Sequence, residues 1–234
     1  MLPVLILAGG LGTRLGELTE SIPKVLVEVA NKPFIYHQLK LLESNGIKEI
    51  VVALGHFGEK VQNYVEGLDD INMQINYSFD GDKLLGTGGA ILNSLTLLSD
   101  PFYIMYGDSF LDIDYFEIAK YFLKKDKKAL MTVLKNKNHW DRSNIEFSDE
   151  KILNYDKENI TDRMEYVDYG LGILRKSAFE NYSDGEKFDL AELYKKLINR
   201  NEMMAFEVKK RFYEVGSFIG INETSEYIKK KLGN

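Results

Sequence analysis

The sequence predicts an α/β fold in which a mixed, mainly parallel sheet is flanked by helices and carries a smaller antiparallel extension. Strand-like and helix-like segments alternate through about residues 1–125, which is the pattern of an α/β domain. Residues 4–8 are apolar without interruption, as expected of a strand buried on both faces of a parallel sheet. Residues 126–234 contain strands with few helices between them, which predicts an antiparallel extension packed on the first sheet.

The first half gives strands and helices in regular order. Pro33 stands at the start of a helix that ends at Asn45-Gly46. The remaining segments are predicted strands over 4–8, 49–54, 74–78 and 102–106 and predicted helices over 58–66 and 88–98. Ligands bind at the carboxyl ends of the strands in such a Rossmann-like sheet, so we expect one shared mouth for the loops after Ala8, Leu54, Ser78 and Tyr106.

The second half continues the chain without a break in composition. Its predicted strands cover 129–134, 144–147, 151–155, 169–174, 204–208 and 212–215, and its predicted helices cover 190–197 and 223–231. No linker rich in Pro or Ser separates the halves and no internal repeat occurs. We therefore expect residues 1–234 to form one domain.

Composition excludes several classes of chemistry. The 234 residues include 36 Asp and Glu, 30 Lys and Arg, 3 His and no Cys, with a formal net charge of −6. Absence of Cys removes disulfides, thiolate nucleophiles and Cys-based metal sites, and 3 His argue against a His-rich metal site. The acidic balance argues against a general nucleic-acid binder, so an anionic ligand needs a local group of cations.

No segment predicts a membrane span or a signal peptide. The apolar run at residues 1–8 is too short to cross a bilayer and has no basic residues before it. No apolar stretch of about 18 residues occurs elsewhere. The default expectation is a cytoplasmic protein without membrane partners.

The strongest functional signal is a glycine-rich loop directly after the first strand. It reads Leu7-Ala8-Gly9-Gly10-Leu11-Gly12-Thr13-Arg14-Leu15 and is followed by Pro23-Lys24. Glycines after a buried strand let backbone N–H groups approach phosphates, Arg14 offers a guanidinium fork, and Lys24 offers a mobile point charge. The string has neither the Gly-Lys-Ser/Thr of a Walker A loop nor the glycine spacing of the dinucleotide-binding fingerprint. It predicts nucleotide binding of another kind.

This loop resembles that of the sugar-1-phosphate nucleotidylyltransferases, which carry a Gly-Gly-x-Gly-Thr-Arg-Leu string and a downstream Pro-Lys. The resemblance extends over essentially the whole chain, through Leu85-Gly86-Thr87-Gly88-Gly89-Ala90, Tyr106-Gly107-Asp108, Tyr155-Asp156-Lys157, Asp168-Tyr169-Gly170 and Tyr213-Glu214-Val215-Gly216-Ser217. It implies a GT-A-like nucleotidyltransferase fold and the formation of a nucleoside diphosphate sugar and pyrophosphate from an NTP and a sugar 1-phosphate. The heptose and mannose 1-phosphate guanylyltransferases are the most similar members, which favours GTP.

The resemblance also implies a role for particular residues. The nucleotide would bind about residues 1–125, at Leu7, Ala8, Gly9, Gly10, Gly12, Thr13, Gly86, Thr87 and Gly88. The sugar phosphate would bind about residues 126–234 together with Gly107, at Asp156, Asp168, Tyr169 and Gly170. Because two anions must meet, cations carry the catalysis. Arg14 would neutralise the leaving pyrophosphate, Lys24 would bridge the α-phosphate and the incoming phosphate, and Lys157 would hold the sugar phosphate.

A magnesium site is expected at the end of the fourth predicted strand. Asp108 follows the apolar run 102–106, where a carboxylate suits Mg²⁺ that also takes phosphate oxygens and water, although a turn-capping Asp is the structural alternative. The family's second metal carboxylate is usually the Asp of an Asp-x-Gly string. Here Glu214-Val215-Gly216 stands in its place, and Glu is a competent oxygen ligand.

Several features leave the substrate and the activity open. Leu84 stands where pyrimidine-specific members have a Gln, which disfavours UTP and dTTP, and Asp168 departs from the usual Asn. Residues 140–144, with the single Trp, are either a lid or sugar-binding edge or an ordinary loop.

Two alternative functions stay open. One is cytidylyl or other nucleotidyl transfer to a different sugar or a non-sugar phosphate, and the other is a catalytically silent nucleotide-sugar sensor. The chain is expected to be a monomer or a homodimer.

Overall fold

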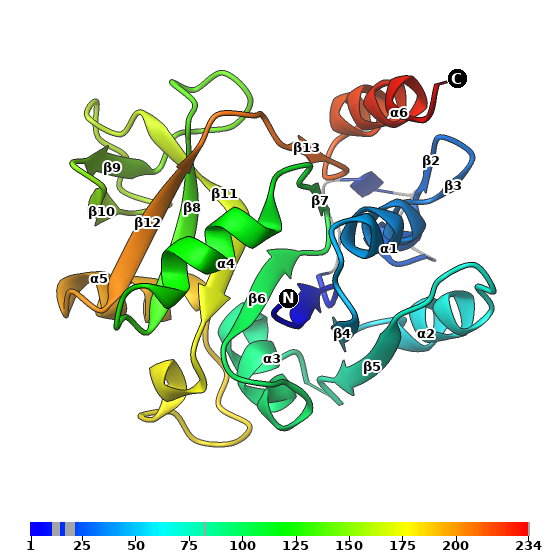
Figure 1. The fold of residues 1–234 in the computed structure, drawn as a ribbon, viewed down its shortest axis with the longest axis horizontal. Helices are drawn as coiled ribbons and strands as arrows, with labels where there is room; N and C mark the ends of the chain where they lie inside the picture. The colour runs from blue at the N-terminus through cyan, green and yellow to red at the C-terminus, as the bar shows by residue number, and fades with distance from the viewer. Residues whose placement is uncertain (11–14, 17–21, 82, 234) are drawn as a thin grey trace.

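A nine-stranded sheet runs across the centre of the protein (Figure 1). The computed structural model describes residues 1–10, 15–16, 22–81 and 83–233. Along the sheet the strands follow the order β10-β9-β11-β6-β1-β4-β5, while β8 pairs with β11 and β12 pairs with β8. Their bounds are β1 Val4–Leu7, β4 Glu49–Leu54, β5 Gln74–Phe79, β6 Phe102–Tyr106, β8 Ala129–Lys135, β9 Ile145–Ser148, β10 Lys151–Tyr155, β11 Tyr166–Leu174 and β12 Met203–Val208.

The first half of the chain forms the parallel part of the sheet, as the sequence predicts. Strand β1 pairs in parallel with β4 on one side and β6 on the other, and β4 pairs in parallel with β5. Side chains of β1 alternate between two core clusters, with Val4 and Ile6 in one and Leu5 in the other. Both faces of β1 are therefore buried, which explains why its sequence is apolar without interruption.

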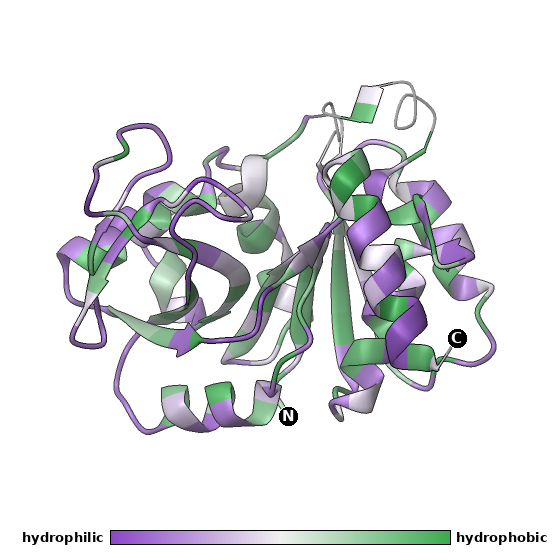
Figure 2. Ribbon diagram, turned by 90° about the horizontal axis from the view of Figure 1, so that it is seen from above, coloured by the Kyte–Doolittle hydropathy of each residue, from purple (hydrophilic) through white to green (hydrophobic). Residues whose placement is uncertain are grey.

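Helices cover both faces of the sheet. Their bounds are α1 Phe34–Ser44, α2 Gly58–Glu66, α3 Gly86–Ser94, α4 Tyr115–Leu123, α5 Leu190–Asn199 and α6 Phe218–Leu232. Apolar side chains of α1, α2 and α4 belong to the core cluster of Val4, whereas those of α3 and α5 belong to the cluster of Leu5. The helices carry both hydrophilic and hydrophobic residues along their length (Figure 2), as expected of helices with one face on a core.

The predicted antiparallel extension is present. It joins the first sheet edge to edge rather than packing on it, because β11 pairs with β6. Strand β11 is antiparallel to β6, β8 and β9, but β12 pairs with β8 in parallel. Residues 169–174 of β11 are buried on both faces, which requires a central position in a sheet rather than a place on an outer layer.

Smaller elements complete the site region, and of these the sequence predicted only the strand at 212–215, which the structure confirms as β13. Helix α4 begins after Asp114, whose carboxylate accepts the N–H of Glu117, and places Tyr115, Ile118 and Phe122 in the core. The two-residue strands β7 (Ser109–Phe110) and β13 (Tyr213–Glu214) pair antiparallel, as do β2 (Glu28–Val29) and β3 (Lys32–Pro33). The β7–β13 pair brings the C-terminal part of the chain beside the end of β6.

Among the described residues, no helix combines the length and the apolar composition needed to cross a bilayer.

Candidate active site

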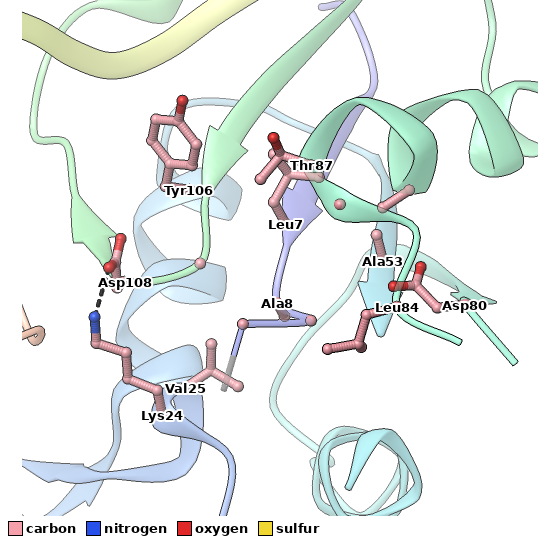
Figure 3. A pocket seen from close by; sticks show the side chains of 15 residues that line it. Leu7, Ala8, Lys24, Val25, Ala53, Asp80, Leu84, Thr87, Tyr106 and Asp108 are labelled. Atoms are coloured by element: carbon pink, nitrogen blue, oxygen red, sulfur yellow. Dashed lines mark hydrogen bonds and ion pairs between the residues drawn. The ribbon is translucent and has the colours of Figure 1, made fainter. Parts of the chain in front are cut away.

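A cavity of about 520 Å³ opens at the carboxyl ends of four parallel strands. Its walls come from β1 and the glycine loop, from the ends of β4 and β5, from the start of α3 and from the residues that follow β6 (Figure 3). The residues are Leu7, Ala8, Gly9, Gly10, Lys24, Val25, Ala53, Asp80, Leu84, Gly86, Thr87, Ala90, Tyr106, Gly107 and Asp108. The loops predicted after Ala8, Ser78 and Tyr106 therefore share this mouth, whereas the loop after Leu54 lines a neighbouring cavity and β4 contributes Ala53 alone.

Close backbone contacts fix the rim of this cavity. The N–H of Gly107 donates to Leu7 O at 3.0 Å, and a Cβ on Gly107 would lie 2.7 Å from the same oxygen. Gly9 and Gly55 face each other in a similar way, since a Cβ on Gly55 would lie 2.8 Å from Gly9 O. Side chains at these positions would push the strand ends apart, so glycine keeps β1, β4 and β6 close at the rim of the cavity.

One end of the cavity carries the predicted catalytic lysine and the predicted metal carboxylate. Lys24 lies in the short 3-10 helix η2 (Lys24–Leu26), and its Nζ donates to Asp108 Oδ2 at 2.6 Å (Figure 3). The side chains are 12% and 31% exposed, so the pair is only partly screened by water. Ser109 Oγ donates to the other oxygen, Asp108 Oδ1, at 3.3 Å. The two opposite charges therefore neutralise each other at the mouth of the cavity.

The opposite end of the cavity has an apolar wall. Ala53 and Leu84 line it, with Asp80 as its charged group (Figure 3), and Ala90 is a further apolar residue of the lining. None of the sequence motifs pointed to Asp80. The available signal was its position directly after a parallel strand, the same signal that identified Asp108.

The turn at the start of α3 is shaped mainly by a neighbouring segment. Gly86 and Thr87 line the cavity. The N–H of Gly88 donates to Phe188 O at 3.0 Å, and a Cβ on Gly88 would lie 2.2 Å from the Phe188 ring. A Cβ on Gly86, which has a φ of +74°, would lie 2.6 Å from Phe188 O. Packing against residues 186–188 thus explains these glycines, and a nucleotide contact at Gly88 stays a prediction.

Beyond Tyr106, the predicted sugar residue Asp168 lies in a cluster of tyrosines. Tyr106 Oη donates to Asp168 Oδ2 at 3.5 Å, and the Gly170 N–H donates to Asp168 Oδ1 at 3.0 Å. Burial raises the pKa of Asp168, while the nearby Lys157 acts in the opposite direction. Lys157 Nζ lies 5.7 Å from the ring centre of Tyr106 and 5.9 Å from that of Tyr155. Lys157, Asp168 and Gly170 therefore surround Tyr106, which also lines the main cavity.

Two other predicted sugar residues have side chains engaged elsewhere. The Asp156 carboxylate accepts the N–H groups of Asn159 and Glu158 and pairs with Lys195 at 3.1 Å, and these contacts hold its pKa well below its usual range. Tyr169 is 1% exposed and packs edge-on against Phe212, because side chains alternate along β11 and Tyr169 follows Asp168. This alternation leaves only the backbone of Tyr169 on the side of Asp168.

Glu214 lies close to Asp108 along the backbone, but its carboxylate is engaged at the start of α6. Its partner in the β7–β13 pair is Ser109, and the Val215 N–H donates to Asp108 O at 3.0 Å. The side chain accepts hydrogen bonds from the Gly216 N–H and from Ser217 Oγ. Metal binding by Glu214 stays a prediction. Three predicted residues of the glycine loop, Gly12, Thr13 and Arg14, lie outside the described residues.

The loop around Trp140 is held together by its own polar side chains. Asn136 Oδ1 accepts the Trp140 N–H at 3.1 Å, and Ser143 Oγ accepts the N–H of Asn138 at 3.0 Å. The guanidinium of Arg211 lies 5.1 Å from the Trp140 ring centre. The contact of Arg211 with Trp140 ties the loop to the segment before β13.

Comparisons with known proteins agree with this geometry. A sequence model of the nucleotidyl transferase family matches residues 3–230. The chain is 32% identical over 198 residues to the D-glycero-alpha-D-manno-heptose 1-phosphate guanylyltransferase of Campylobacter jejuni, covering 82% of this chain and 86% of that protein. It is 32% identical over 135 residues to the mannose-1-phosphate guanylyltransferase catalytic subunit beta of Drosophila pseudoobscura, covering 56% of this chain and 36% of that protein. The crystal structure of HddC from Yersinia pseudotuberculosis complexed with GMP-PN superposes with a TM-score of 0.79 at 25% identity, covering 98% of this chain and 100% of that chain.

Proposed function

Because the chain belongs to the nucleotidyl transferase family, we propose that it forms a nucleoside diphosphate sugar and pyrophosphate from GTP and a heptose or mannose 1-phosphate. One observation supports this most: the cavity pairs a phosphate-binding end, with Lys24 and Asp108, with an apolar end of the kind that holds a base. The names of the relatives supply the base and the sugar of the proposal. We propose that the protein acts in the cytoplasm as a monomer or a homodimer. Its proposed role is to supply a nucleotide sugar for cell-surface polysaccharides.

The proposed chemistry needs positive charge rather than a nucleophile from the protein. A phosphate oxygen of the sugar 1-phosphate attacks the α-phosphorus of GTP, a new P–O bond forms, and the bond to the β-phosphate oxygen breaks to release pyrophosphate. The attacking oxygen is already ionised, so no general base is required. Lys24 stands at the phosphate end and reduces the repulsion between the two anions, while Lys157, beyond Tyr106, holds the sugar phosphate. The role proposed for Arg14 is neutralisation of the pyrophosphate.

We propose Mg²⁺ as the cofactor, with Asp108 as its protein ligand. The carboxylate is 31% exposed at the cavity mouth and accepts no backbone N–H from the residues that the structure describes, which fits an exchangeable oxygen ligand. Among the described residues no three His, Cys, Asp or Glu side chains gather as a metal cage. Mg²⁺ is commonly bound by one or two carboxylates together with water and substrate phosphates, so this sparse donor set fits it. When bound, the ion would add positive charge against the phosphates. Glu214 is the proposed second ligand.

Pyrophosphate release tests this function. The purified chain with Mg²⁺ is assayed with GTP, ATP, CTP, UTP and dTTP against mannose, heptose and glucose 1-phosphates and against a polyol phosphate and choline phosphate. We expect the highest kcat/KM for GTP with a mannose-like or heptose 1-phosphate. A preference for CTP with a non-sugar phosphate would replace the proposed substrates. NTP binding without pyrophosphate release from any pair would instead identify a silent sensor.

A further inference from the structure

Asp80 is a carboxylate at the apolar end of the cavity, away from the cations of the phosphate end. It follows β5, and its backbone N–H donates to Leu54 O at 2.9 Å, which fixes it to the neighbouring strand. Its side chain lines the cavity beside Leu84 and Ala53 (Figure 3). The position is therefore set by the sheet, and the carboxylate faces whatever fills this end of the cavity.

Within the described residues, one oxygen of the Asp80 carboxylate has a hydrogen-bond donor and the other has none. Oδ2 accepts the N–H of Leu85 at 3.2 Å. Within the described part of the chain no lysine, arginine or histidine forms an ion pair with Asp80, whereas Asp108 and Asp112 have such partners. Burial raises the pKa of Asp80 and the Leu85 N–H only partly offsets this. A half-buried carboxylate without a cation is stabilised by any ligand that brings neutral hydrogen-bond donors to it.

The bases differ in what they bring to such a group. An ionised carboxylate accepts hydrogen bonds and donates none. Guanine presents two adjacent donors, N1–H and the N2 amino group. Uracil and thymine present one N–H between two carbonyl oxygens, and adenine and cytosine each place a ring-nitrogen acceptor beside their amino group. Guanine alone therefore pairs with a carboxylate through two parallel bonds without setting an acceptor against it.

From these observations we propose that Asp80 selects the guanine base by accepting hydrogen bonds from N1–H and N2–H. The proposal rests on the proposed function and deepens it, because it assigns the preference for GTP to one residue. The apolar side chains of Leu84, Ala53 and Ala90 cover the base, which keeps water from competing for the two bonds. Leu84 disfavours pyrimidines only because its side chain offers them no hydrogen-bonding group. Asp80, in contrast, accepts hydrogen bonds from the edge of the guanine base.

A purely structural role for Asp80 would make a different prediction. Its bond to the Leu85 N–H closes the loop of residues 80–85 before α3, and that bond alone would make Asp80 a loop-fixing residue. Such a role predicts equal effects on every NTP. Selection of guanine predicts effects that depend on the donors of the base.

The first experiment uses the unaltered protein and base analogues. Inosine triphosphate lacks only the N2 amino group, and N1-methyl-GTP lacks the N1–H. A hydrogen bond to a charged group contributes about 1.5–3 kcal/mol, so kcat/KM for inosine triphosphate is expected to be about 10- to 100-fold below that for GTP. N1-methyl-GTP is expected to be at least as poor. Equal use of GTP and inosine triphosphate would overturn the proposal.

The second experiment compares Asp80→Asn with Glu59→Gln, a control that removes an exposed carboxylate of α2 outside the cavity. The Asn oxygen retains an acceptor for the Leu85 N–H. We expect kcat/KM for GTP to fall about 10- to 100-fold and kcat/KM for inosine triphosphate to fall less, because inosine loses only the N1–H bond to the carboxylate, so that the ratio of the two moves towards one. The KM for the sugar phosphate stays unchanged, and Glu59→Gln keeps the wild-type ratio.

The outcomes separate the two proposals. If the wild type prefers GTP but Asp80→Asn retains the GTP to inosine triphosphate ratio, Asp80 is not the selecting residue and the proposed function stands. If the wild type prefers CTP or UTP, the guanylyl function fails, and the assignment of Asp80 fails with it. If Asp80→Asn does not fold, the analogue series on the wild type still decides.

Discussion

At the scale of single residues, the Lys24–Asp108 ion pair connects the fold to the proposed chemistry. The two side chains come from η2 and from the end of β6, 84 positions apart in the chain, and meet at 2.6 Å. Each neutralises the other in the absence of substrate. Substrate phosphates would bind the Lys24 ammonium and a metal ion would bind the Asp108 carboxylate. Each side chain would then exchange its present ionic partner for a new one, and neither charge would be left unpaired in the partly buried site.

Removal of the Lys24 charge tests its role. Lys24→Met keeps most of the side-chain volume but leaves Asp108 unpaired and the phosphates without their cation. We expect at least an about 10²-fold loss of kcat, by analogy with the loss of other electrostatic stabilisers. Lys120→Met is the control, since Lys120 is an exposed residue of α4 that pairs with Glu117. Turnover of Lys24→Met at the wild-type rate would contradict the role given to Lys24.

The candidate site shows which residues a sequence reveals. Lys24 and Asp108 follow from a loop string and from the end of an apolar strand, and the structure brings them together. Asp80 likewise lies just after a parallel strand but has no surrounding motif, so only the three-dimensional cavity identifies it. Tyr169 was assigned by its neighbours in a string, although strand alternation turns its side chain into the core.

At the scale of elements, the start of α3 depends on the segment before α5. Gly88 and Gly89 both donate their N–H groups to Phe188 O, Phe188 donates back to Leu85 O, and the Leu190 N–H donates to Thr87 Oγ1. The Phe188 ring stacks on Tyr182 with ring centres 4.0 Å apart. The cavity wall formed by Gly86 and Thr87 is therefore fixed by hydrogen bonds with Phe188 and Leu190, about 100 positions later in the chain.

This packing predicts the effect of a single methyl group. In Gly88→Ala the new Cβ would lie 2.2 Å from the Phe188 ring, so the ring must leave its stack on Tyr182. Overpacking of this kind costs about 1–3 kcal/mol, and the better helix propensity of Ala offsets at most about 1 kcal/mol. Urea unfolding is expected to show the net loss. Gly67→Ala is the control, because its Cβ would make only ordinary contacts at 3.5 Å. Equal stability of both variants would contradict this account.

Element prediction succeeded where the signal was local. Strands 49–54 and 102–106 and the helix 58–66 have their predicted bounds because apolar periodicity and flanking turns define them within the segment. Helix α4 is absent from the predicted elements, although its sequence has the same kind of signal, an Asp N-cap before apolar residues at helical spacing. The edge-to-edge pairing of β11 with β6 joins two segments that are distant in the sequence. Local periodicity identifies each strand but does not indicate which strand it pairs with.

At the scale of the whole molecule, one carboxylate ties the C-terminal helix to the body of the protein. Asp112, which follows β7, accepts hydrogen bonds from Lys231 and Tyr227 of α6 and from Lys210 after β12. Burial alone would raise the pKa of Asp112, but these three donors outweigh it and lower the pKa to about 2. Helix α6 also packs through Ile228 on a cluster with Val215 and Phe34.

The depressed pKa makes a prediction about stability and pH. The folded-state pKa lies below that of the unfolded chain, so ionised Asp112 stabilises the fold above about pH 4, and this contribution declines as the pH falls towards 2. Asp112→Asn is expected to lower the free energy of unfolding by about 2 kcal/mol at pH 7 and by about half of that near pH 3. Urea unfolding across this range measures it, with the exposed Asp126→Asn as control. A difference that does not change with pH would contradict the assignment.

The central claim is that the cavity transfers a nucleotidyl group from GTP to a sugar phosphate. Phosphorus NMR of the purified chain with Mg²⁺, GTP and mannose or heptose 1-phosphate tests it most directly, because it resolves every phosphorus-containing product. We predict that the sugar monophosphate signal declines while a sugar-linked diphosphate and free pyrophosphate appear in equal amounts. Release of inorganic phosphate with GDP, or no change in the sugar monophosphate with either sugar, would contradict the claim.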